Sequence, residues 1–94
     1  MSRLSGSEIK SKLTGLNGWV FKDNAIKKIF TFSAYMDGID FVQKIAKLAE
    51  IHNHHPDIII GWCRVDINIT SHDKGGVTTN CINLATAIDH TIKI

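Results

Sequence analysis

The chain has 94 residues, which predicts a single domain over residues 1–94 with one modest core. Hydrophobic residues make up 44% of it and charged residues 21%, a balance typical of soluble globular proteins. The net charge of +2 is too small to indicate a direct nucleic-acid partner, and no apolar run approaches the roughly 20 residues that span a membrane. The amino-terminal residues do not form the apolar segment of a secretory signal, and Cys63 and Cys81 are too few for a disulfide scaffold. We therefore expect reduced thiols and a cytoplasmic location.

Hydrophobic periodicity and turn residues predict seven elements in chain order. They are a helix over 7–16, strands over 19–22 and 25–33, a helix over 35–52, strands over 57–62 and 64–70, and a last helix capped by Thr78 or Thr79. Ser5 and Glu8 have the spacing of a capping box at the start of the first helix. Asp23–Asn24 is the turn of the first hairpin. Two hairpins joined by a helix predict an α+β fold of order α-β-β-α-β-β-α, with a four-stranded antiparallel sheet and three helices packed on one face.

The helix over 35–52 is the most strongly patterned element. Its apolar residues spread over about 180° of arc, wider than the roughly 100° stripe of a helix that packs on one surface only. We expect it to pack on the sheet and on a second surface. That surface is either another helix of the same domain or a partner subunit.

Five histidines occur in the chain, and three of them fall between His52 and His55. Pro56 is the only proline, and it biases His55 towards an extended backbone, so the long helix must end near His52 or Asn53. If the strands over 57–62 and 64–70 are antiparallel neighbours, the start of one lies beside the end of the other. This topology brings His72 beside His54 and His55.

Neighbouring imidazoles have three interpretations at this point. They can serve in acid–base catalysis, because their pKa lies near neutral pH. They can bind a metal, or they can be polar loop residues without a site. The candidate metal ligands are His52, His54, His55, Asp57 and His72. Gly75 and Gly76 favour a site, since they let the backbone approach a ligand closely.

Other side chains near these elements have simpler interpretations. Trp19 and Trp62 are able to wall a flat aromatic ligand, although such tryptophans are more often core residues, and Trp19 fits a core position better than a site. His52 and His90 lie near helix carboxyl ends, where a cation suits the helix dipole, and we expect both to be structural.

The motif Glu50-x-x-x-His54-His55-Pro56, followed by Trp62, Ser71-His72 and Gly76-Val77-Thr78, resembles the pterin-4a-carbinolamine dehydratases, also known as dimerisation cofactors of a homeodomain transcription factor. Similarity extends to Gly18-Trp19, Phe30-Thr31-Phe32, Ala49-Glu50 and Ile82-Asn83-Leu84-Ala85. The resemblance implies the α+β fold predicted above. It also implies loss of water from a 4a-hydroxytetrahydropterin to give the quinonoid dihydropterin, in tetrahydrobiopterin recycling, without a metal or an organic cofactor.

By matching position, the resemblance implies that His54, His55 and His72 are catalytic. We hypothesise that His55 acts on the hydroxyl, that His72 acts on the ring proton, and that His54 orients the substrate. The implied substrate-binding residues are Glu50, Pro56, Ser71, Asp73 and Lys74.

The resemblance also bears on partners. It implies a small-molecule pterin substrate and a homodimer or homotetramer, with the helix over 35–52 as a candidate interface. The alternative is a catalytically weak relative that acts as an oligomeric protein-binding or assembly cofactor. Many family members carry Asp where this chain has Cys81, and this departure puts the efficiency of the reaction in doubt.

Overall fold

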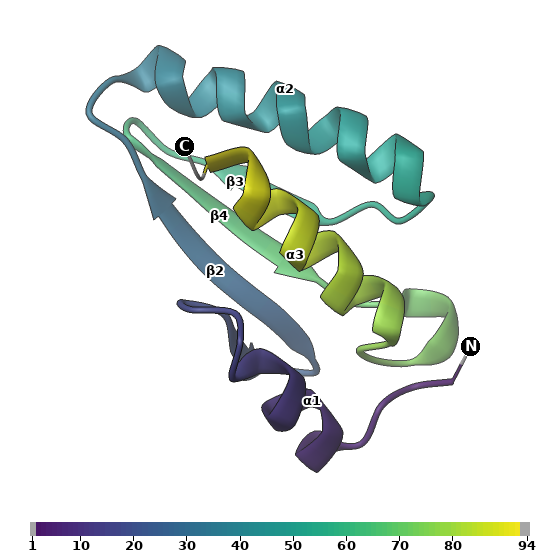
Figure 1. The fold of residues 1–94 in the computed structure, drawn as a ribbon. Helices are drawn as coiled ribbons and strands as arrows, with labels where there is room; N and C mark the ends of the chain where they lie inside the picture. The colour runs from purple at the N-terminus through teal and green to yellow at the C-terminus, as the bar shows by residue number, and fades with distance from the viewer. Residues whose placement is uncertain (1, 93–94) are drawn as a thin grey trace.

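The structure, a computed structural model, describes residues 2–92. Its elements in chain order are α1 (Gly6–Leu13), β1 (Val20–Lys22), β2 (Ala25–Thr31), α2 (Tyr35–His52), β3 (Asp57–Ile60), β4 (Arg64–Ile69), a 3₁₀ turn (His72–Lys74) and α3 (Thr79–Ile92). The four strands form one antiparallel sheet of order β1-β2-β4-β3. Figure 1 shows the three helices against this sheet, with α2 and α3 running alongside one another. The predicted α+β fold is confirmed.

Local sequence accounts for how the first elements begin and turn. Ser5 and Glu8 form the complete capping box, with the Ser5 hydroxyl accepting from the Glu8 amide and the Glu8 carboxylate accepting from the Ser5 amide. Asp23 and Asn24 both have left-handed backbone angles, with φ values of 53° and 61°. Two such residues between antiparallel strands match the right-handed twist of a hairpin. The predicted turn is therefore confirmed.

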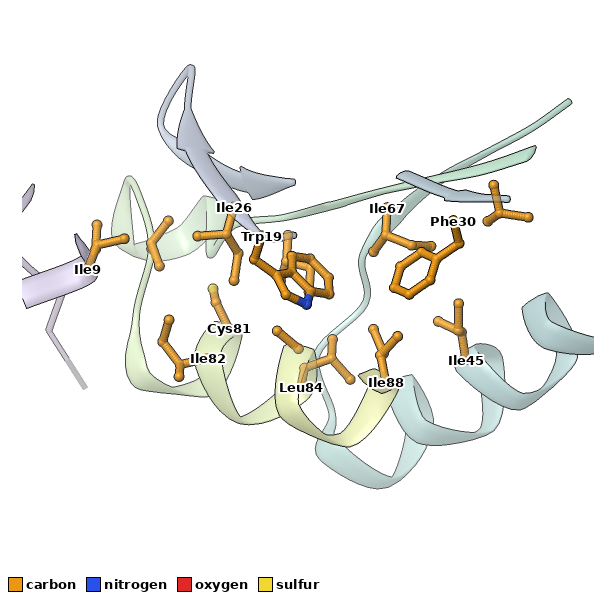
Figure 2. Packing of buried hydrophobic residues seen from close by; sticks show 14 of the residues in the cluster. Ile9, Trp19, Ile26, Phe30, Ile45, Ile67, Cys81, Ile82, Leu84 and Ile88 are labelled. Carbon is orange, nitrogen blue, oxygen red and sulfur yellow. The ribbon is translucent and has the colours of Figure 1, made fainter. Parts of the chain in front are cut away.

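Alternation along β4 divides the sheet into a covered face and an open face. Val65, Ile67 and Ile69 are buried, while Asp66 and Asn68 between them point to the other side. Figure 2 shows Ile67 and Phe30 of the sheet facing Ile45 of α2 and Ile88 of α3. All three helices contribute to this one core, which places them on the same face.

Several elements are shorter in the structure than predicted, because hydrogen bonds of a turn replace those of the helix or strand. The helix predicted over 7–16 ends at Leu13, because the Thr14 amide and hydroxyl both turn back to the Ser11 carbonyl. The strand predicted over 57–62 ends at Ile60, since the Gly61 amide closes the turn onto Arg64 O at 2.7 Å. The helix predicted over 35–52 has those bounds.

Among residues 2–92, no helix has the length and apolar content needed to cross a bilayer.

Truncating an isoleucine should lower the free energy of unfolding by different amounts on the two faces of the sheet. Ile67 is 1% exposed in the core, and Ile59 is 64% exposed on the open face. Ile67→Ala should lower the free energy of unfolding by about 2–5 kcal/mol, because it removes buried methyl groups and leaves a cavity. Ile59→Ala should change it by less than about 1 kcal/mol. Urea unfolding of both variants measures the difference, and equal losses would contradict this assignment of faces.

Candidate active site

The histidine corner starts with a left-handed cap at the end of α2. Asn53 adopts φ 50° and ψ 44°, and its amide bonds back to the carbonyls of Ala49 and Glu50. The His54 amide also donates to Ala49 O, at 3.0 Å. These bonds satisfy helix carbonyls that would otherwise lack partners and turn the chain out of the helix. The helix therefore ends as Pro56 predicted, and His54 and His55 lie in the connection to β3.

His72 lies at the same end of the sheet. Asp57 at the start of β3 pairs with Asn68 near the end of β4, so the residues before β3 run alongside those after β4. Ser71 and Gly76 then form an isolated antiparallel bridge, with the Ser71 amide donating to Gly76 O at 2.9 Å. His72 begins the 3₁₀ turn that this bridge closes. The predicted meeting of the two segments is confirmed.

His55 is held by Glu50, five residues before it in the last turn of α2. Its Nε2 is hydrogen-bonded to Glu50 Oε2, and the side chains are 58% and 76% exposed. An ionised carboxylate can only accept a hydrogen bond, so the proton of this bond sits on Nε2. The other ring nitrogen, Nδ1, is left to exchange a proton.

His54 turns the other way, towards the core. Its Nε2 lies 3.2 Å from Cys81 Sγ on the first turn of α3. Cys81 is completely buried, and its sulfur lies 3.4 Å from Ser71 Oγ. The Ser71 hydroxyl in turn shares a 2.8 Å hydrogen bond with that of Thr78. The buried thiol of Cys81 is thus in polar contact with a candidate catalytic histidine.

The surroundings of His54 lower its pKa. Partial burial is the main cause, because it penalises the charged imidazolium. Asp73 opposes this effect and raises the pKa. The neighbouring imidazoles of His55, His52 and His72 lower it further. His54 is accordingly a neutral ring at neutral pH.

A clamp on the His72 loop was not foreseen from the sequence. The Gly75 carbonyl accepts from Asn24 Nδ2 at 2.7 Å and from Arg3 Nη1 at 3.3 Å. Gly75 itself has a φ of 76°, a conformation that glycine adopts without strain. No local pattern links Arg3 or Asn24 to a residue so far along the chain. The bonds tie the loop to the amino-terminal segment and to the first hairpin turn.

The other predicted substrate-binding residues lie on the same two segments. Pro56 is half-buried, and Asp73 and Lys74 are exposed on the 3₁₀ turn. Ser71 is buried, with its hydroxyl directed to Thr78 rather than to solvent.

Within one chain, neither tryptophan lies beside the three candidate catalytic histidines. Trp19 is a core residue, as expected, and its Nε1 donates to Asp89 at 3.0 Å. Trp62 is 82% exposed in the turn between β3 and β4, at the far end of those strands from the histidines. Trp62 of the same chain therefore cannot wall a ligand held there, and that expectation was wrong.

The metal interpretation finds no support in the arrangement of side chains. Over the described residues, no three His, Cys, Asp or Glu side chains are gathered in a way that could hold a metal ion. His54 and His55 contact different partners, Cys81 and Glu50, so these two candidate metal ligands point away from each other.

Comparison with known proteins identifies the family. The sequence pattern of the family described as Pterin 4 alpha carbinolamine dehydratase matches residues 2–91. The chain belongs to this family. It is 44% identical over 88 residues to a protein of Roseiflexus sp. (strain RS-1) that is provisionally named pterin-4-alpha-carbinolamine dehydratase, covering 94% of this chain and 95% of that protein. A Sulfurisphaera tokodaii protein with the same provisional name is 36% identical, covering 98% and 99%.

Solved structures agree with this assignment. A crystal structure of a transcriptional coactivator/pterin dehydratase from Brucella melitensis matches with a TM-score of 0.90 and 32% identity, over 95% of this chain and 97% of that one. A pterin dehydratase-like protein described as a RuBisCO assembly factor in the alpha-carboxysome matches with a TM-score of 0.63 and 23% identity, over 77% and 83%. The second likeness is one of fold.

The lowered pKa of His54 predicts a dependence of stability on pH. Below the ordinary pKa of 6.5, the unfolded chain protonates this imidazole while the folded chain keeps it neutral to lower pH. Its contribution to stability is therefore complete above 6.5 and is lost as the pH falls towards the folded pKa. Between about pH 7.5 and 5, the native chain should lose more free energy of unfolding than His54→Gln does. Equal losses in native protein and His54→Gln would refute the prediction.

Proposed function

We propose that this chain dehydrates a 4a-hydroxytetrahydropterin to the quinonoid dihydropterin. The observation that carries the proposal is the pair of adjacent histidines in opposite environments. His55 is exposed and bonded to a carboxylate, while His54 is turned inward and its pKa is lowered. Such divergent environments give neighbouring titratable groups separate roles in acid–base chemistry.

The reaction needs only proton transfers. The departing hydroxyl takes a proton, the bond between its oxygen and carbon 4a breaks, and water leaves. The neighbouring ring nitrogen loses its proton, and a carbon–nitrogen double bond forms between the two ring atoms. An acid and a base with pKa values near neutrality are the groups this chemistry requires, and it involves no redox change.

Glu50 suits His55 to the acid step. The carboxylate accepts from Nε2 and stabilises the ring when it is protonated. Nδ1 is then the atom that delivers a proton to the hydroxyl. We assign removal of the ring proton to His72 on the clamped loop, and orientation of the substrate to His54. Pro56, Asp73 and Lys74 are the remaining proposed pterin contacts, whereas Ser71, also predicted to be one, is buried with its hydroxyl directed to Thr78.

The proposed reaction also implies a metabolic context, a cellular compartment and a cofactor requirement. The product is an oxidised pterin that a reductase must reduce again, so the reaction belongs to tetrahydrobiopterin recycling. We expect it to take place in the cytoplasm, with no metal or organic cofactor.

Dehydration of a 4a-hydroxytetrahydropterin generated in situ tests this function. His55→Ala should lower turnover about 10²- to 10⁴-fold, because it removes the acid. Glu50→Gln should lower it less, since the amide still accepts from Nε2 but no longer supports the imidazolium. His90→Ala, exposed near the end of α3, is the control and should keep native turnover. Native protein that is folded but no faster than buffer would refute the proposal.

A second candidate function is protein binding or assembly. It is favoured by apolar side chains exposed on the open face of the sheet, Val20, Ile29 and Ile59. They line a hollow of about 460 Å³ that contains none of the histidines. Exposed apolar side chains gathered around a hollow often mark an interaction site, and Asp66 lies here between Ile29 and Ile59. This function would be separate from the histidine corner.

Homo-oligomerisation is proposed through α2. Most of its wide apolar arc packs within the chain, where Phe41, Ile45 and Ala49 are buried in the core. Tyr35 and Met36 remain exposed at its first turn. Together with Ile51, which is exposed at the last turn, these two side chains are the large apolar residues of the helix still available to a second copy.

Sedimentation velocity over a range of concentrations tests the interface. Met36→Glu should raise the dissociation constant about tenfold or more, because it puts a charge into an apolar contact. Lys47→Glu introduces the same side chain at an exposed polar position of α2 and should have little effect. A native chain that is monomeric throughout would contradict the proposed oligomer.

A further inference from the structure

The sulfur of Cys81 lies at the centre of a buried polar cluster. His54 Nε2 is its nearest polar neighbour at 3.2 Å, followed by Ser71 Oγ at 3.4 Å and the Thr78 amide nitrogen at 3.5 Å. Figure 2 shows the Cys81 side chain pointing from α3 towards the sheet, within the hydrophobic cluster. A polar contact in such surroundings is strong electrostatically and has few alternative partners.

The direction of the contact follows from what each neighbour can give. The Thr78 N–H can only donate, so it points at the sulfur. One of the Ser71 and Thr78 hydroxyls donates to the other at 2.8 Å, and the remaining hydroxyl hydrogen can donate to the sulfur. The thiol has one hydrogen to donate, and the imidazole nitrogen at 3.2 Å is a stronger base than either hydroxyl oxygen.

We propose that Cys81 is a positioning residue, whose thiol donates to His54 Nε2 and thereby fixes His54 in the tautomer that carries its proton on Nδ1. The bond made by one ring nitrogen determines the state of the other. Burial supports the arrangement, because it disfavours an imidazolium at His54. Of the groups that bear on His54, only Asp73 favours the charged ring, while His52, His55 and His72 oppose it.

The consequence for the reaction rests on the function proposed above. His54 with its proton on Nδ1 presents a hydrogen-bond donor and no free basic nitrogen. It can orient a pterin oxygen or ring nitrogen, but it cannot accept the proton that the ring must lose. The thiol therefore confines His54 to substrate positioning and leaves proton transfer to His55 and His72.

Nitrogen-15 NMR of the imidazole rings tests the tautomer directly at about pH 7.5, above the ordinary histidine pKa. In the native chain, the His54 proton should be on Nδ1. Cys81→Ser keeps a donor and should retain that tautomer. Cys81→Ala should give a mixture, and Cys81→Asp should move the proton to Nε2, because a carboxylate only accepts. Cys63→Ser is the control for loss of a thiol elsewhere.

A native His54 with its proton on Nε2, or a tautomer unchanged in Cys81→Ala, would overturn the proposal. Should Cys81→Asp not fold, the Ser and Ala variants still decide it. In the dehydration assay, Cys81→Ala should lower kcat/KM roughly tenfold while Cys81→Ser stays within a few-fold of native. If the NMR spectra show the predicted tautomers but the native protein has no turnover, the proposed function is refuted. The link between Cys81 and His54 then still holds.

Discussion

The register of β4 is the constraint on which the rest of the structure depends. This strand pairs with β2 on one side and β3 on the other, and Val65, Ile67 and Ile69 form the centre of the core. A slip by one residue would turn all three towards solvent and expose the core. The same register decides which residues meet beyond the strand ends. Asp57 is fixed opposite Asn68, so the chain entering β3 and the chain leaving β4 must run side by side.

The candidate site uses this meeting point and one property of extended backbone. Pro56 keeps His55 out of the helical conformation, and successive side chains of an extended segment point to opposite sides. His54 therefore turns inward to Cys81, while His55 turns outward to Glu50 at the end of α2. Two histidines adjacent in sequence thus obtain different exposure, different partners and different electrostatic surroundings. None of the three histidines lies in an α-helix or a strand, but these elements place all of them.

Much of this could be predicted from local sequence. The capping box at Ser5, the turn at Asp23–Asn24, the alternation in β4 and the helix end before Pro56 each depend on neighbouring residues. The contacts that the sequence did not reveal join residues far apart. Cys81 meets His54 across 27 positions, and Arg3 meets Gly75 across 72. Such pairs depend on how α3 and the amino-terminal segment pack, which periodicity does not specify. The suggested ligand-walling role of Trp62 failed for a different reason, since the predicted strands over 57–62 and 64–70 already put it at their turn, away from the histidines.

The partners of the two histidines suggest how one fold can assign separate tasks to identical side chains. Glu50 accepts a hydrogen bond and so places the His55 proton on Nε2, leaving Nδ1 free to give or take a proton. A thiol that donates to His54 has the opposite effect and leaves Nδ1 protonated. Were a carboxylate in place of Cys81, both rings would be driven to the same tautomer and His54 would gain a basic nitrogen. On this argument, the residue at position 81 determines whether His54 can take part in proton transfer or only hold the substrate.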